Sequence, residues 1–277
     1  MSERDWRSGL REARLQAHYA AQWLGRAGGA FIPPRPDYSH TSMNWIDPLN
    51  AFSTNALKGE TRFALIIPDL SFLFLDMGAE RTSLFSLSGC TDKDVRQWLG
   101  GELAASGMQV EKLDRVAPYD IPAHAIGEGD AYSVVGIGNQ LSELAVWFSE
   151  ANSALEKIQR AMTGRSLAAS PVRCWPHHFD LATLISLDEG GGENGRSVNA
   201  GLSPGDDYYD EPYYYVTPYP HPDAAALPPL PKLGHWHTRE FTAAIAPASQ
   251  IVKAKDRKAK TDNFLRAAVD GAIKILS

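Results

Sequence analysis

Two adjacent histidines precede an aspartate in the segment "CWPHHFDLATLISL", which begins at Cys174. If this segment is one β-strand, the alternation of side chains places His178 and Asp180 on one face and His177 on the other. An imidazole that titrates near neutral pH, beside a carboxylate that fixes its tautomer, suits general acid–base catalysis. We therefore take Asp180 and His178 as candidate catalytic residues, and we expect Asp180 to matter more than either histidine.

A second polar set lies near the N-terminus, where Arg14, His18 and Gln22 follow one another at four-residue intervals. On a helix this spacing puts them on one face, which is either exposed to solvent or turned toward a ligand or another element. If His18, His40 and Asp180 converge, they form a His–carboxylate arrangement for acid–base chemistry. His18 and His40 complete the catalytic candidates. The candidate ligand-binding residues are Gln22, Tyr213 and Trp175.

A metal site is the alternative chemistry, because "HWH" would place His235 and His237 on one face if this segment is extended. Together with His178 and Asp180 they would supply four ligands, as in a zinc-dependent hydrolase. Neither pair matches a specific zinc spacing, and two-residue fragments arise often by chance. We predict no cofactor, and we keep zinc bound by His178, Asp180, His235 and His237 as the alternative.

Composition and charge restrict the partners. The chain of 277 residues has a net charge of -6 and 44% hydrophobic residues, so it can bury a large core. Binding to nucleic acid needs clustered Lys and Arg, and the one basic run, "KAKDRKAK", lacks aromatic residues and is typical of a solvated helix start. The acidic loop "SPGDDYYDEPYYY" does not follow the calcium-loop pattern and is interpreted as a solvated turn.

The sequence also argues against a membrane protein, and we expect a cytoplasmic location. No apolar run is long enough to span a bilayer, and the charged N-terminal segment has no signal-peptide core. Cys90 and Cys174 lie far apart in the sequence, which favours two reduced thiols over a disulfide.

The expected elements group strands between helices, which indicates an α+β fold. Antiparallel sheets from two halves should pack with a long central helix over 132–162 and with N- and C-terminal helices. We expect one globular unit over 1–277, in which lobes 1–130 and 165–277 are joined by that helix. The remaining helices are expected over 6–24, ended by Gly28-Gly29, over 91–107, and from 262. Strands are expected in "RFALIIP", "SFLFLDM", "RTSLFSLSG", "MQVEKL", "PVRCWPHHFDLATLISL", "RSVNAGL" and "PYYYVTPY".

With these motifs in place, the chain resembles an uncharacterised, mainly bacterial family that is known only as a domain of unknown function. The resemblance rests on "LQAHYAAQWLGR", which matches a Leu-x-x-His with a later Gln, and on "HHFDLA", "GLSPGD" and "PYYYVTPYP". The family's Asn-His is Ser39-His40 here, and its paired tryptophans are Thr41-Ser42. The resemblance implies that His18, Gln22 and His40 matter, and it implies no reaction.

Two functions from different classes remain open. The first is a cytosolic enzyme with a small-molecule cleft between the N-terminal helix and the C-terminal β region, lined by His18, Gln22, His40, His178, Asp180 and Tyr213. The second is a non-catalytic binding or assembly module, in which the same residues form a buried polar network. A homo-oligomer fits either function. A ligand-sized pocket lined by these residues favours the enzyme, and a closed, hydrogen-bonded interior favours the module.

Overall fold

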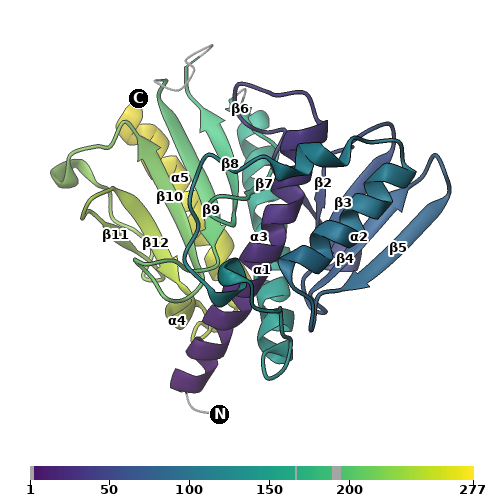
Figure 1. Cartoon of the computed structure of the whole chain (residues 1–277). Coiled ribbons are helices and arrows are strands. Elements are labelled where there is room, and N and C mark those ends of the chain that lie inside the picture. Colours follow the sequence, from purple (N-terminus) through teal and green to yellow (C-terminus); the bar gives the residue numbers. More distant parts are fainter. Residues whose placement is uncertain (1–2, 166, 189–194) are drawn as a thin grey trace. The chain divides into compact units, whose positions relative to one another are not determined.

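The computed structural model describes residues 3–165, 167–188 and 195–277 (Figure 1). Its helices and antiparallel strands confirm the predicted α+β class, with helices at both ends and a long helix in the middle of the chain. The chain divides into two compact units. Unit 1 comprises Met1–Ser149 and Cys174–Phe179, and unit 2 comprises Glu150–Arg173 and Asp180–Ser277.

Unit 1 contains the N-terminal helix and a mostly consecutive series of antiparallel strands. The strands pair in the order β7-β1-β2-β3-β4-β5, and the predicted consecutive strands β3, β4 and β5 are confirmed. The helix α2 begins with the expected capping box of Thr91 and Asp94. The bounds in this unit are α1 (Glu3–Phe31), β1 (Met43–Ile46), η1 (Asp47–Leu49), β2 (Ala51–Thr54), β3 (Thr61–Ile66), β4 (Ser71–Asp76), β5 (Arg81–Ser86), α2 (Asp92–Ala105), η2 (Val110–Asp114), η3 (Ala125–Glu128) and β7 (Arg173–Trp175).

The N-terminal helix does not end at Gly28-Gly29, as the sequence predicted, but continues to Phe31. The reason for Gly28 is a close approach, because a Cβ on it would lie 2.5 Å from the backbone oxygen of His40. The glycine therefore lets the segment around His40 pack directly on the helix backbone.

The predicted strand "MQVEKL" is wrong, because Val110–Asp114 is the 3-10 helix η2. Met108 and Leu113 are the buried residues of this segment. Their spacing does not fit the two-residue repeat of a strand. The chain turns instead, so that Leu113 is buried while its neighbours stay in solvent.

The long helix α3 (Gly138–Thr163) begins later than predicted, after Gly136 adopts a left-handed conformation with φ 80°. Its apolar stripe is buried, as expected, and in unit 1 the Phe148 ring packs 4.7 Å from Phe52 of β2 and 5.9 Å from Trp45 of β1. The buried stripe residues are Ile137, Leu141, Leu144, Phe148, Ala151, Leu155, Ile158 and Met162.

Unit 2 contains antiparallel strands in the order β11-β12-β10-β9-β8, and β6 pairs with β8. The C-terminal helix α5 packs on β9, β10 and β12 and begins at Arg257, earlier than predicted (Figure 1). The bounds in this unit are β6 (Ala168–Ala169), β8 (Asp180–Ser186), β9 (Ser197–Ser203), β10 (Tyr213–Tyr219), η5 (Ala224–Ala226), β11 (His235–His237), β12 (Ala243–Pro247), α4 (Ala248–Ile251) and α5 (Arg257–Leu276).

Two further expectations concern the whole chain. Cys90 and Cys174 are free thiols, as predicted. Among the described helices, none combines the length and the apolar character that crossing a bilayer requires.

Candidate functional site

The histidine pair lies on a tight turn of unit 1, which we call the histidine turn (residues 175–179). The predicted unbroken strand over 171–187 is wrong, because Phe179 donates its backbone N–H to the carbonyl of Trp175 at 2.7 Å. Pro176 also lacks the N–H that a strand ladder needs. The argument that alternation puts His178 and Asp180 on one strand face therefore does not hold. Phe179 adopts φ 55°, a left-handed conformation that is rare for an aromatic residue.

Side chains of helix α1 contact this strained turn. The carbonyl of Pro176 accepts a hydrogen bond from Nε2 of His18 at 2.8 Å and one from Nε2 of Gln22 at 2.6 Å. The fully buried Phe179 ring stacks on His18, with centroids 5.3 Å apart. These contacts offset the cost of the left-handed backbone, which is about 1–3 kcal/mol.

The polar stripe of α1 therefore faces the interior of unit 1. Arg14, His18 and Gln22 are all buried, and the Tyr119 hydroxyl donates to Oε1 of Gln22 at 3.0 Å. Burial lowers the pKa of His18 to about 4, although its hydrogen bond to Pro176 acts in the opposite direction. At neutral pH His18 is an uncharged donor to a backbone carbonyl, with Nε2 protonated.

The two histidines of the turn face outward. His178 is exposed, His177 is half-buried, and their rings lie 4.3 Å apart. Tyr119 lies 5.6 Å from the His177 ring. Burial and the neighbouring His178 lower the pKa of His177 to about 4, so its imidazole is neutral at pH 7.

The other predicted residues make separate local contacts. His40, in unit 1, accepts a hydrogen bond at Nδ1 from the backbone N–H of Arg35 at 3.1 Å. Trp175 is half-buried in the histidine turn, 6.4 Å from the His177 ring. The structure thus brings His18, Gln22 and the histidine turn together, and no described contact adds His40 to that set.

Asp180 and Tyr213 belong to unit 2. Asp180 is buried at the start of β8, and its Oδ2 accepts a hydrogen bond from the Tyr215 hydroxyl. The Tyr215 ring lies over Gly201, where a Cβ would be 2.5 Å from the hydroxyl. Tyr213 donates to Oδ2 of Asp206 instead. Each side chain therefore has a partner within its own sheet or loop.

The alternative metal ligands divide between the units, with His178 in unit 1 and Asp180, His235 and His237 in unit 2. The condition that "HWH" is extended is met, because these residues form β11, and both of its histidines contact the hydroxyl of Tyr209. Over residues 3–165, 167–188 and 195–277, no group of three or more His, Cys, Asp or Glu side chains is placed to hold a metal ion.

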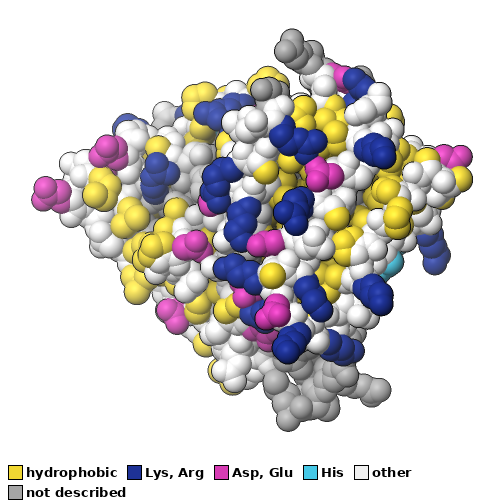
Figure 2. All heavy atoms as spheres, turned by 180° about the vertical axis from the view of Figure 1, so that it is seen from behind, with side chains coloured by type: hydrophobic (Ala, Val, Ile, Leu, Met, Phe, Trp, Pro, Cys, Tyr) yellow, Lys and Arg dark blue, Asp and Glu magenta, His cyan; other side chains and the backbone are white. Residues whose placement is uncertain are grey.

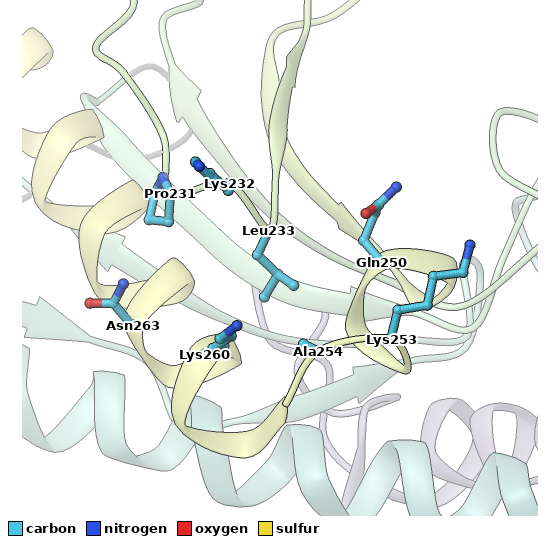
Figure 3. A pocket seen from close by; sticks show the side chains of 8 residues that line it. All are labelled: Pro231, Lys232, Leu233, Gln250, Lys253, Ala254, Lys260 and Asn263. Carbon is cyan, nitrogen blue, oxygen red and sulfur yellow. The ribbon is translucent and has the colours of Figure 1, made fainter. Parts of the chain in front are cut away.

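A pocket of about 350 Å³ lies in unit 2, beside the start of α5 (Figure 3). Leu233 is buried and forms part of its floor. Lys232, Lys253 and Lys260 are exposed at its wall, and their side chains have no hydrogen bond or ion pair to any described residue. The remaining lining residues are Pro231, Gln250, Ala254 and Asn263. The pocket can therefore attract an anion without first breaking an internal salt bridge.

Sequence reasoning missed Tyr119 and the pocket residues. Tyr119 lies in a loop without any periodic pattern, so nothing in the sequence connects it to Gln22, its hydrogen-bond partner. For the basic run 253–260 the sequence predicts only a solvated helix start. The available signal was that this run follows a proline-rich connector, whose residues Pro231–Leu233 line the same pocket.

Comparison with known proteins identifies no similar protein. No family model, no curated protein and no solved structure matches this chain.

Proposed function

We propose that this protein is a non-catalytic binding module for a small anionic molecule, held in the lysine pocket of unit 2. The observation that supports this most directly is the pocket of about 350 Å³, whose wall carries Lys232, Lys253 and Lys260 without an ion pair to any acidic side chain that the structure describes. Its size falls at the lower end of the range of small-molecule sites.

The predicted acid–base residues favour a module over an enzyme. His18 and Gln22 are buried and hydrogen-bonded to the backbone of the histidine turn, and Asp180 is bonded to Tyr215. None of the predicted site residues lines the pocket. A buried and satisfied polar network specifies a fold, whereas a catalytic group must reach the substrate.

The pocket chemistry suits a compact dianion such as a phosphate ester or a dicarboxylate. Leu233, Pro231 and Ala254 give it an apolar floor, and Gln250 and Asn263 add amide donors beside the lysines. The positive end of the α5 dipole lies close to Lys260, in the first turns of that helix. The whole chain has a net charge of -6, and Figure 2 shows Lys and Arg side chains interspersed with acidic ones on the surface that it draws.

The test is anion binding by the full chain at 150 mM salt, a condition close to physiological ionic strength. Inorganic phosphate, pyrophosphate and citrate are titrated by calorimetry, with chloride as the reference anion. We expect one of these probes to bind at one site, with an affinity that falls as the salt concentration rises. The variant Lys253→Glu/Lys260→Glu should lose at least about tenfold in affinity, which corresponds to about 1.4 kcal/mol.

The control is Lys255→Glu/Lys258→Glu, which changes the net charge equally on the same segment but outside the pocket. It separates local recognition from the general effect of net charge. Equal loss in both variants, or no binding of any probe by the wild-type protein, contradicts the proposed function.

The remaining expectations belong to the same proposal. Membership of the uncharacterised bacterial family rests on the motifs "HHFDLA" and "GLSPGD". A cytoplasmic location is supported by the two free thiols. The absence of nucleic-acid partners is supported by the net negative charge, and a homo-oligomer stays compatible with the module.

A further inference from the structure

Three nitrogen and oxygen donors converge on the surface of unit 2. The hydroxyl oxygen of Tyr209 lies 3.1 Å from Nε2 of His235 and 3.0 Å from Nδ1 of His237. The two histidines are separated by one residue on β11, so the strand itself puts them on one face. The cluster contains a tyrosine, so it is not one of the groups of three His, Cys, Asp or Glu side chains considered above.

The tautomer of His237 is fixed by its other nitrogen. Nε2 lies 2.6 Å from the backbone carbonyl of Arg239, which can only accept, so Nε2 carries the proton. Nδ1 therefore presents its lone pair toward Tyr209. A histidine that donates one ring N–H to a backbone carbonyl and directs the other nitrogen at a shared point has the arrangement of a typical metal ligand.

Tyr209 is held in place by its own loop. Oδ1 of Asp206 accepts the backbone N–H groups of Tyr208 at 2.9 Å and Tyr209 at 3.0 Å. The Tyr213 ring packs on the Tyr209 ring, with centroids 4.9 Å apart. The phenol is thus positioned by contacts that do not involve the histidines.

The spacing of the donors is close to that of a metal site. Tetrahedral coordination with bonds of about 2.0–2.1 Å to nitrogen and oxygen separates neighbouring ligand atoms by about 3.3 Å. The observed separations from the Tyr209 oxygen are 3.1 and 3.0 Å, so these two separations differ from that value by only a few tenths of an ångström. Without a metal the same contacts form a hydrogen-bond chain, in which Nε2–H of His235 donates to the phenol oxygen and the phenol donates to Nδ1 of His237.

We propose that His235, His237 and Tyr209 form a binding site for a transition-metal ion that prefers imidazole, Zn²⁺ or Cu²⁺. His235 is exposed, so the three side chains lie at the surface, where water can supply a fourth ligand. On binding, the hydrated ion exchanges waters for three protein ligands, and the phenol releases its proton to solvent. His235 moves its proton to the solvent-facing Nδ1, so one proton leaves for each ion bound.

The experiment uses the full chain without a histidine tag, stripped with a chelator and then titrated with Zn²⁺, Cu²⁺, Mg²⁺ and Ca²⁺ by calorimetry. We expect one Zn²⁺ or Cu²⁺ per chain and no binding of Mg²⁺ or Ca²⁺, which prefer oxygen ligands. His235→Ala/His237→Ala should weaken binding at least about 100-fold, or about 2.7 kcal/mol. The matched control is His177→Ala/His178→Ala, which also removes two neighbouring imidazoles and should leave the affinity unchanged.

Tyr209→Phe tests the third ligand by spectroscopy. The Cu²⁺ complex of the wild-type protein should show a phenolate-to-copper charge-transfer absorption that this variant lacks, with weaker but measurable binding by the two histidines. The proposed site is wrong if the wild-type protein binds neither Zn²⁺ nor Cu²⁺ at one equivalent. It is also wrong if His177→Ala/His178→Ala loses binding while His235→Ala/His237→Ala keeps it. An unchanged spectrum and affinity in Tyr209→Phe overturns the three-donor arrangement. Anion binding in the lysine pocket is a separate measurement, so either proposal can fail without the other.

Discussion

His18 of unit 1 and His237 of unit 2 make the same hydrogen bond in opposite surroundings. Each ring has Nε2 beside a backbone carbonyl, that of Pro176 at 2.8 Å and that of Arg239 at 2.6 Å. His18 is buried and stacked on Phe179, so its ring serves to hold the histidine turn. His237 is half-buried on an edge strand, and its second nitrogen faces a phenol beside solvent. The contrast teaches that the surroundings of the second nitrogen decide whether a carbonyl-bound histidine is structural or available to a ligand.

Removing each ring should therefore have very different effects on stability. His18→Ala leaves a cavity under Phe179 and removes one of the two donors to Pro176, so we expect a loss of about 3 kcal/mol in the free energy of unfolding. In a chain of this size the melting temperature should fall by roughly 6–12 °C. Thermal denaturation checks this.

His237→Ala is the matched variant and should change the free energy of unfolding by less than about 1 kcal/mol, because its ring is only half-buried. Equal melting temperatures for the two variants would remove the distinction between a structural and an available histidine.

The dependence of stability on pH sharpens the same comparison. Burial lowers the pKa of His18 to about 4 in the folded protein, whereas the unfolded chain has the ordinary value of about 6.5. Between these pH values the unfolded state binds more protons than the folded state. The contribution of neutral His18 to the free energy of unfolding is therefore complete above pH 6.5 and is lost as the pH falls toward 4. Between pH 7 and pH 5 the loss from His18 should be about 2 kcal/mol.

His18→Gln keeps an N–H donor and removes the titration. Urea denaturation at pH 7 and pH 5 should therefore show a smaller drop in the free energy of unfolding for this variant than for the wild-type protein. A drop of the same size in His18→Gln and in the wild-type protein would mean that His18 is not the group responsible.

The fold could be predicted further than the site. Apolar periodicity predicts the long helix, because the stripe from Leu141 to Met162 is buried whatever covers it. Consecutive strands such as β3 to β5 pair with their neighbours along the chain, so local patterns are sufficient. The sequence also marks His18 and Gln22 as one face of a helix, and both prove to be buried.

The error at the histidine turn has a physical cause. The residues 171–187 fit a strand by composition, and the two prolines, at its first residue 171 and at 176, are compatible with an edge strand. What decides the turn is distant in sequence, since the donors to Pro176 come from α1 and the Phe179 ring packs on His18. Tyr209 could not be predicted for the same reason, because the histidines that it contacts lie on β11. The pocket lysines are a second case, because Lys253 and Lys260 line one pocket with Pro231–Leu233 only in the folded chain.

The smallest effect we predict separates two tyrosines of unit 2. Tyr215 donates its hydroxyl to the buried carboxylate of Asp180, and burial together with that charge raises its pKa well above the ordinary value. Tyr215→Phe leaves Asp180 without this donor, so we expect a loss of about 1.5 kcal/mol in the free energy of unfolding. Tyr209→Phe should cost less than about 0.5 kcal/mol, because the histidines that it contacts can bond to water instead. Urea denaturation of both variants at pH 7 makes the comparison. A larger loss in Tyr209→Phe would mean that the Tyr209–His235–His237 cluster holds the sheet together, and the metal experiment would then need His235→Gln/His237→Gln, which preserves hydrogen bonding while removing the imidazole ligands.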